Sequence, residues 1–215
     1  MTNLRWLDAL ERRFGSWTVH EFPLFIVMAN GLVYLLSFKQ PALVSKLILI
    51  PGAVWEGEWW RVLTFLFVPP TMGPIGMALW LYFLYQMANT LENEWGEFRF
   101  CFFYFIGALA TVIASLFIAR QSLSNVPLNT TLFLAFAALY PEMEILLFFI
   151  LPIRVKYLAW LTWAWISWSF ITGGTVSRIA IGASLFNYFL FFGQDLWQGV
   201  KLKIHVYRNR NRFRN

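Results

Sequence analysis

The chain has 215 residues, of which 59% are hydrophobic, 20% aromatic and only 13% charged, and its mean hydropathy is +0.58. Soluble domains are usually about 45–50% apolar and about 25% charged. This composition therefore excludes a disordered chain, a collagen-like chain and an ordinary cytosolic enzyme. The formal net charge is +6, and a single cysteine, Cys101, excludes a disulfide framework within the chain.

Residues 1–20 are predicted to form an N-terminal unit outside the lipid. Leu4, Leu7, Leu10 and Phe14 recur at spacings of three and four, with charged residues between them. This pattern predicts an amphipathic helix. Such a helix either lies on the membrane surface or caps a helical bundle, and the sequence favours neither.

Residues 21–197 are predicted to form the membrane domain, because six apolar segments follow one another between charged or helix-breaking residues. The predicted spans are Phe22–Phe38, Ile75–Leu91, Phe98–Ala119, Leu128–Tyr140, Val155–Ile171 and Ile179–Leu196. The apolar stretch Ile145–Leu151 is too short to cross. The fourth span is also short, at about 20 Å against a hydrocarbon core of about 30 Å, unless its helix begins as early as Leu123.

The first connection, Gln40–Pro74, is long and places Trp55, Trp59 and Trp60 beside charged residues. Aromatic and charged residues mix in this way at the headgroup level. We therefore predict an interfacial loop or hairpin here rather than a span. The fold class predicted for the chain is an all-α integral membrane bundle of six spans with a long interfacial first loop.

Residues 198–215 form a predicted basic tail with six Lys and Arg residues and no acidic residue. Such a cluster attracts anionic lipid at about 1 kcal/mol per charge, or serves only as a topology signal. Its alternation of apolar and basic residues would also suit an added strand, whereas nucleic-acid binding is not expected. Twelve Lys and Arg residues on the side of the two termini against five on the other predict that both termini are cytoplasmic.

The residues of known intramembrane catalysts are missing from the predicted spans. Both histidines, His20 and His205, lie in terminal segments, so no imidazole is available there to accept a hydroxyl proton. The only aspartates, Asp8 and Asp195, lie near opposite ends of the chain. Neither a zinc-binding H-E-x-x-H motif nor a glycine-rich nucleotide loop occurs. We expect no metal, no cofactor and no catalytic residue.

An ordered set of short motifs resembles the rhomboid superfamily. The matching segments are the W-R element Trp60-Arg61, the pair Gly73-Pro74 found in Derlins, the F-L-Y…L-E pattern that ends at Glu92, Gly107-Ala108-Leu109, and Tyr140-Pro141-Glu142 followed by Phe149–Ala159. The resemblance covers residues 57–193. It implies a rhomboid-like bundle of six spans.

The resemblance also shows what has been lost. Asn129 lies about where an active rhomboid has its catalytic serine, and Ala180 lies near the position of the histidine. The glycine pair that follows this histidine in the family corresponds to Gly182-Ala183. The neighbouring Thr130 and Thr131 carry hydroxyl groups, but without a base they would be inert.

The chain is therefore similar to a pseudoprotease, like Derlins or inactive bacterial rhomboid-like proteins. The resemblance implies a non-enzymatic protein that binds transmembrane clients or partner membrane proteins, in membrane-protein quality control. We expect the client groove between the second and fifth spans, with Gln86, Asn89, Trp160 and Trp163 facing it, although such polar groups more often join helices.

Two other functions stay open at this stage. One is an adaptor subunit of a larger membrane complex, such as a membrane protease assembly, and the other is an atypical hydrolase that uses Thr130 or Thr131. The overall likeness favours a bacterial cytoplasmic membrane, with the endoplasmic reticulum membrane as the alternative. No Derlin-like motif for an ATPase is found in Lys201–Asn215.

Overall fold

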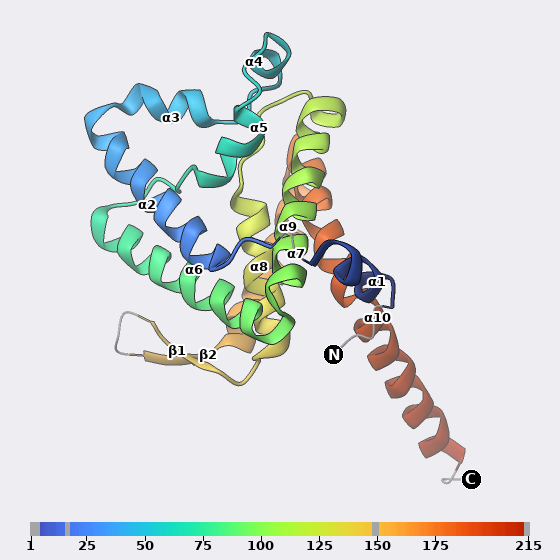
Figure 1. Ribbon diagram of the computed structural model, residues 1–215. Coiled ribbons are helices and arrows are strands. Elements are labelled where there is room, and N and C mark those ends of the chain that lie inside the picture. The colour runs from blue at the N-terminus through green and yellow to red at the C-terminus, as the bar shows by residue number, and fades with distance from the viewer. Residues whose placement is uncertain (1–4, 16–17, 148–150, 213–215) are drawn as a thin grey trace.

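The computed structural model describes residues 5–15, 18–147 and 151–212, which are mostly helical (Figure 1). The helices are α1 (Arg5–Phe14), α2 (Phe22–Lys39), α3 (Pro41–Leu47), α4 (Pro51–Trp55), α5 (Arg61–Thr64), α6 (Pro74–Trp95), α7 (Glu97–Ile113), α8 (Val126–Leu139), α9 (Val155–Thr172) and α10 (Thr175–Arg212). A 3₁₀ turn, η2 (Phe65–Phe67), follows α5, and a π-helical stretch, η3 (Ala114–Ala119), extends α7. Strands β1 (Glu144–Leu147) and β2 (Leu151–Arg154) form a hairpin.

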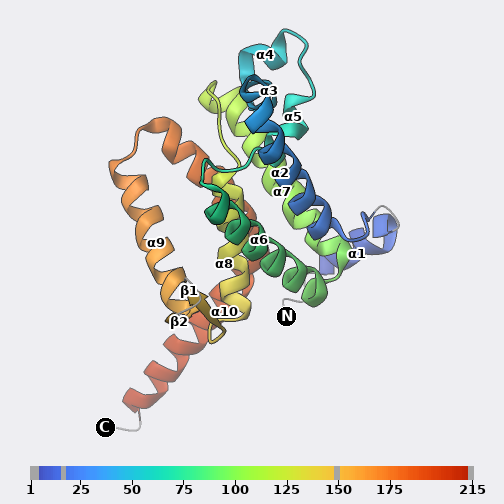
Figure 2. The ribbon, with the colours of Figure 1, turned by 90° about the vertical axis from the view of Figure 1, so that its left-hand side faces the viewer.

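Helix α8 lies in the middle of the bundle, among α6, α7, α9 and α10 (Figure 2). Helix α7 packs against α6, α8 and α10. Phe100, Phe103 and Tyr104 are fully buried along its inner face. Helix α2 packs on the outer side of α6, and α8 packs against α6, α9 and α10. The core is therefore built around α7 and α8, and α9 has much less buried surface than either.

Helix α1 is held against the N-terminal part of α7. Arg99 of α7 donates to Asp8 at 2.6 Å and to Glu11 at 2.9 Å, and Leu7 is 1% exposed. These contacts correspond to the second of the two arrangements expected for the amphipathic helix, in which it caps the bundle.

The six predicted spans each overlap one helix, α2, α6, α7, α8, α9 or α10. Within the part of the chain that the structure describes, three stretches are long and apolar enough to cross a membrane: Phe22–Lys39, Glu97–Ala119 and Thr175–Gly193. Helix α8 has 14 residues, a rise of about 21 Å, and it begins at Val126 rather than Leu123. Six spans remain a prediction, because α6 and α9 carry polar or tryptophan side chains where a span is usually aliphatic.

Two local features were not predicted. The bundle is mostly helical, but the segment after α8 adds a short two-stranded hairpin, β1–β2, in which Ile145 pairs with Ile153 and Glu144 with Arg154. β-Branched and opposite-charge cross-strand pairs stabilise such a hairpin. In addition, the boundary predicted between the sixth span and the basic tail lies inside α10, because Lys, Arg and Leu all favour continued helix. The proposed contacts of the tail's basic side chains with lipid lie outside the described side chains.

Candidate functional site

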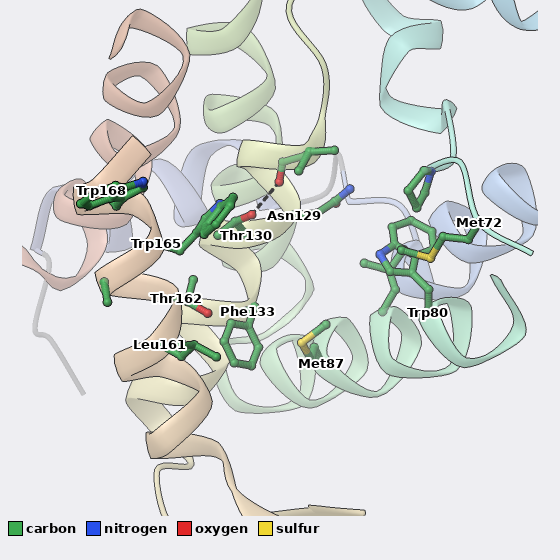
Figure 3. A pocket seen from close by; sticks show the side chains of 14 residues that line it. Met72, Trp80, Met87, Asn129, Thr130, Phe133, Leu161, Thr162, Trp165 and Trp168 are labelled. Carbon is green, nitrogen blue, oxygen red and sulfur yellow. Dashed lines mark hydrogen bonds between the residues drawn. The ribbon is translucent and has the colours of Figure 1, made fainter. Parts of the chain in front are cut away.

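A groove of about 890 Å³ lies between α6, α8 and α9 (Figure 3). It is lined by apolar and aromatic side chains together with a few polar ones. Helix α6 contributes Trp80, Leu84 and Met87, α8 contributes Val126, Asn129, Thr130 and Phe133, α9 contributes Leu161, Thr162, Ala164, Trp165 and Trp168, and the segment before α6 adds Pro70 and Met72. Its lining is therefore mostly hydrophobic, as in other pockets that accept apolar ligands.

The groove exists because α8 separates the two helices beside it. Helix α8 packs against both α6 and α9, whereas α6 and α9 have no extensive contact with each other. Figure 2 shows α9 standing away from α6, with α8 between them. On α9, Trp165 and Trp168 are 70% and 64% exposed. The groove thus runs along the side of the bundle that the apolar helices present to lipid.

Three polar side chains lie in the groove wall. Thr130 donates to the carbonyl oxygen of Val126 at 2.9 Å (Figure 3), and Thr162 donates to that of Leu158 at 2.9 Å. The Oδ1 atom of Asn129 is buried and has no hydrogen-bond partner among the described residues. Because this oxygen is buried, it is an unsatisfied acceptor inside the wall and is not open to an occupant of the groove.

None of the four residues predicted to face the groove is part of its lining. Gln86 and Asn89 lie on α6 but on faces of the helix turned away from the groove residues Trp80, Leu84 and Met87. On α9, Trp160 is 75% exposed, and Trp163 packs against Tyr188 of α10, with ring centroids 5.6 Å apart. Successive residues of a helix point about 100° apart, so choosing Trp160 rather than its neighbour Leu161 selects a different face.

The positions that correspond to the rhomboid serine and histidine do not meet in one cavity. Asn129 lines the groove, while Ala180 lines a separate cavity of about 570 Å³ near the starts of α8 and α10. His20 pairs with Glu97 at 2.8 Å, beside the docked α1, and the side chain of His205 lies outside the described ones. The hydroxyls of Thr130 and Thr131 donate to backbone carbonyl oxygens.

Of two glycines in the motifs, Gly107 and Gly182, only Gly107 lies at a close helix contact. A Cβ atom built on Gly182 would meet nothing within 4 Å. A Cβ atom on Gly107 would lie 2.4 Å from Leu128 Cδ1 and 2.7 Å from Asn187 Nδ2. Gly107, part of the motif Gly107-Ala108-Leu109, thus allows α7 to approach α8 and α10 closely.

The W-R element organises the first connection. Helix α3 ends at Leu47, and its last carbonyl groups have no helical partner. Arg61 Nη1 donates to the carbonyl oxygens of Ser45 and Ile48 at 2.7 and 2.8 Å, and Arg61 Nε donates to Glu58. Trp60 Nε1 binds the Lys46 carbonyl at 3.3 Å and Thr64 Oγ1 that of Leu47 at 3.1 Å. Side chains of this motif thus cap α3.

Asn125 is a further connecting residue, and it belongs to none of the sequence motifs. Its side chain is 3% exposed, and Nδ2 donates to the carbonyl oxygens of Leu66 and Val68 at 2.9 and 3.0 Å. It therefore joins the end of the first connection to the start of α8, which bears the groove residues. The only feature of the sequence that could have indicated this role is the position of Asn125, a polar residue directly before the apolar helix α8.

The other motif residues lie at helix ends. Gly73 and Pro74 begin α6, with proline at the first helical position, where its missing N–H is harmless. Glu92 lies in the last turns of α6, near the backbone N–H of Phe22. One of its carboxylate oxygens is buried and has no hydrogen-bond partner in the described part of the chain. These residues set helix ends rather than a reactive centre.

A cluster of charges surrounds the hairpin. Tyr140 donates to Glu94, which connects the ends of α8 and α6. Glu142 accepts from Lys156 at 2.7 Å and from Arg154 at 3.0 Å. The hydrogen bond from Lys156 is the main reason that the pKa of the Glu142 carboxyl lies below its ordinary value of 4.5, and Arg154 adds to this effect.

Within the described residues, no group of three or more His, Cys, Asp or Glu side chains could hold a metal ion.

The fold and the groove are those of an integral membrane protein with a mostly apolar groove on its side. Residues 21–193 match the family described as eukaryotic integral membrane protein (DUF1751), and the chain belongs to this family. No curated protein matches the chain. Because the family is described as eukaryotic, it favours a eukaryotic membrane over the bacterial one that the sequence resemblance suggested.

Proposed function

We propose that this protein is a non-enzymatic, rhomboid-like membrane protein that binds a transmembrane segment of a client or partner protein in the groove between α6, α8 and α9. The observation that carries the proposal is the groove itself. It is apolar, and it lies between two helices that do not close on each other.

The size of the groove fits part of a helix. A helix is about 10–12 Å across and rises 1.5 Å per residue, so about 890 Å³ corresponds to roughly two helical turns. A client helix with a Ser, Thr or Asn at that level could accept a hydrogen bond from Nδ2 of Asn129, and helix pairs in membranes are commonly joined by such bonds. The groove therefore suits one stretch of a transmembrane helix rather than a whole soluble peptide.

The arrangement of hydroxyl groups supports a binding role over hydrolysis. The candidate nucleophiles Thr130 and Thr131 donate to the carbonyl oxygens of Val126 and Leu128 at 2.9 and 2.8 Å. A hydroxyl nucleophile needs a nearby base, and His20 is engaged with Glu97 near the docked α1. We further propose that the protein lies in the endoplasmic reticulum membrane, with both termini cytoplasmic and a role in membrane-protein quality control, and the eukaryotic family supports this choice of membrane.

Site-specific photocrosslinking in native membranes tests the proposal. A photoreactive amino acid at Met87 or Trp165, both in the groove, should capture discrete membrane proteins through their transmembrane segments. The matched controls are Leu35 and Leu109, which are 65% and 57% exposed on α2 and α7, away from the groove. Equal adducts at groove and control positions would contradict a binding groove.

A second measurement separates binding from catalysis. The purified protein is incubated with a fluorophosphonate probe and a model transmembrane substrate. We expect no labelling and no cleavage. Labelling that is abolished by Thr130→Ala would replace the proposed binding role with the hydrolase alternative.

A further inference from the structure

A third cavity lies at the other end of the bundle from the hairpin, where α4 meets the π-helical stretch η3. Its volume is about 420 Å³, and it is lined by Pro51, Gly52, Trp55, Leu116, Phe117 and Arg120. Figure 1 shows α4 at the end of the molecule opposite the β1–β2 hairpin. The cavity shares no residue with the groove, so the inference drawn from it is independent of the proposed function.

Arg120 is the one charged residue in this lining. Its side chain is exposed, and it makes no ion pair with any carboxylate in the described ranges 5–15, 18–147 and 151–212. By contrast, Arg61 and Arg178, from the same end of the bundle, use their guanidinium groups to bind helix C-terminal carbonyls. The guanidinium of Arg120 is therefore available to an anion, and phosphate is the anion whose geometry it matches best.

The rest of the cavity is apolar and aromatic. The rings of Trp55 and Phe117 meet edge to face at 5.8 Å, and these side chains are 57% and 61% exposed. Tryptophan beside arginine is typical of the membrane–water interface, where ring bodies contact acyl chains and cations contact headgroups. The cavity thus combines a cationic point with a surface for hydrocarbon, which is what an amphiphile requires.

The backbone at the cavity is in an uncommon conformation. Residues 114–119 form a π-helix, and Arg120 has a φ of +51°, in the left-handed region. Glycine is the usual residue at this position, directly after the end of a helix, because the left-handed backbone conformation is strained for a residue with a side chain. π-Helical segments and left-handed non-glycine residues both concentrate at functional sites. An arginine at this position is therefore hard to explain by backbone conformation alone.

We propose that this cavity binds a membrane phospholipid, with Arg120 holding the phosphodiester and with Trp55, Leu116 and Phe117 contacting the upper part of the acyl chains. The occupant is a lipid rather than a free phosphate ion, because most of the lining is hydrocarbon. The bound lipid lies between the interfacial helix α4 and the end of the α7–η3 helix, and it therefore joins the first connection to the bundle.

Native mass spectrometry of the full chain, delipidated in mild detergent and then incubated with phosphatidylglycerol, tests the site. We expect a lipid adduct on the wild-type protein and about tenfold weaker binding in Arg120→Gly, which loses a bidentate phosphate contact. Glycine is chosen because it suits the left-handed backbone, so this variant should unfold at the same or a higher temperature. Lys46→Gln is the matched control, because it removes one exposed positive charge from the same connection, where the Lys46 ammonium has no partner in the described part of the chain.

Each outcome decides the proposal. Weaker binding in Arg120→Gly but not in Lys46→Gln supports the site. Equal binding in the wild type and Arg120→Gly, equal losses in the two variants, or no adduct on the wild type would each overturn it. Release of the lipid by excess inorganic phosphate alone would show a simple anion site and would also overturn it.

Discussion

The guanidinium of Arg61 donates a 2.7 Å hydrogen bond to the carbonyl oxygen of Ser45, sixteen residues earlier in the chain. The same Nη1 atom binds the Ile48 carbonyl at 2.8 Å, so one buried cation satisfies two acceptors at the C-terminal end of α3. Cations are favourable at this end of a helix, because its dipole leaves partial negative charge there. The W-R motif therefore shapes the interfacial connection between α2 and α6 and takes no part in the groove.

Replacing Arg61 should loosen this connection while leaving the bundle folded. Arg61→Gln removes hydrogen bonds made by a charged donor, each typically worth about 1.5–3 kcal/mol, and leaves buried carbonyl groups without a partner. We expect a loss of about 2 kcal/mol and faster hydrogen exchange in α3. Lys46→Gln, in the same helix, should leave exchange unchanged. Wild-type exchange in Arg61→Gln would mean that solvent caps α3 equally well.

Two glycine substitutions should have opposite effects. Gly107→Ala brings a Cβ atom within 2.4 Å of Leu128 and 2.7 Å of Asn187. Such overpacking usually destabilises by about 1–3 kcal/mol. Gly182→Ala meets nothing within 4 Å, and alanine favours helix by up to about 1 kcal/mol over glycine. Thermal unfolding in detergent should therefore show a lower Tm for Gly107→Ala and an equal or higher one for Gly182→Ala.

The opposite order of Tm values would mean that the rhomboid-like glycine pair, not Gly107, provides the close contact. The two variants make the same chemical change inside two helices of the same bundle. A general effect of alanine on helix stability therefore cannot account for a difference between them.

The helices were largely predictable, because their apolar runs and the breaks between them can be read directly. Pro74 and Gly96 mark the two ends of α6, and Pro141 follows α8 closely. The general position of the groove also followed from the resemblance, which placed it between the second and fifth spans. Lipid favours apolar residues on every face of such helices. The lengths of the apolar runs and the Pro, Gly and charged residues between them therefore predict where the helices begin and end.

The residues that face the groove were not predictable for the same reason. In a soluble helix an apolar stripe identifies the buried face, but on α9 aromatic side chains occur on the groove face at Trp165 and away from it at Trp160. The roles of Asn125 and Gly107 depend on contacts between segments distant in sequence, which no local pattern encodes. Such contacts are fixed by packing and become visible only in the structure.

Asn125 should matter more for stability than its place in a connection suggests. Its two hydrogen bonds, at 2.9 and 3.0 Å, satisfy the carbonyl groups of Leu66 and Val68. Asn125→Ala leaves both groups without this donor, at a cost of about 1–3 kcal/mol for each that stays buried. We expect a lower Tm and weaker crosslinking at the groove. Asn129→Ala, the matched asparagine change in the groove wall, should alter crosslinking but not Tm.

The hairpin should respond to acid. The neighbouring Lys156 and Arg154 lower the pKa of Glu142 in the folded protein. A lowered pKa means that the ion pairs stabilise the fold above pH 4.5, the ordinary value, and that this contribution is lost as the pH falls below it. Hydrogen exchange at β1 and β2 should therefore be faster, relative to the intrinsic rate, in acid. Glu142→Gln should abolish this pH dependence, and a dependence that persists in this variant would point to another group.

The docking of α1 should depend on Arg99. Its guanidinium binds Asp8 at 2.6 Å and Glu11 at 2.9 Å, and the side chain is 28% exposed. Partly exposed ion pairs each contribute up to about 1 kcal/mol, so Arg99→Gln should increase hydrogen exchange in α1 by roughly fivefold, since 1.4 kcal/mol corresponds to tenfold. Arg154→Gln, which breaks ion pairs at the hairpin, is the control and should leave α1 unchanged. If α1 is held mainly by the burial of Leu7, exchange in Arg99→Gln will match the wild type.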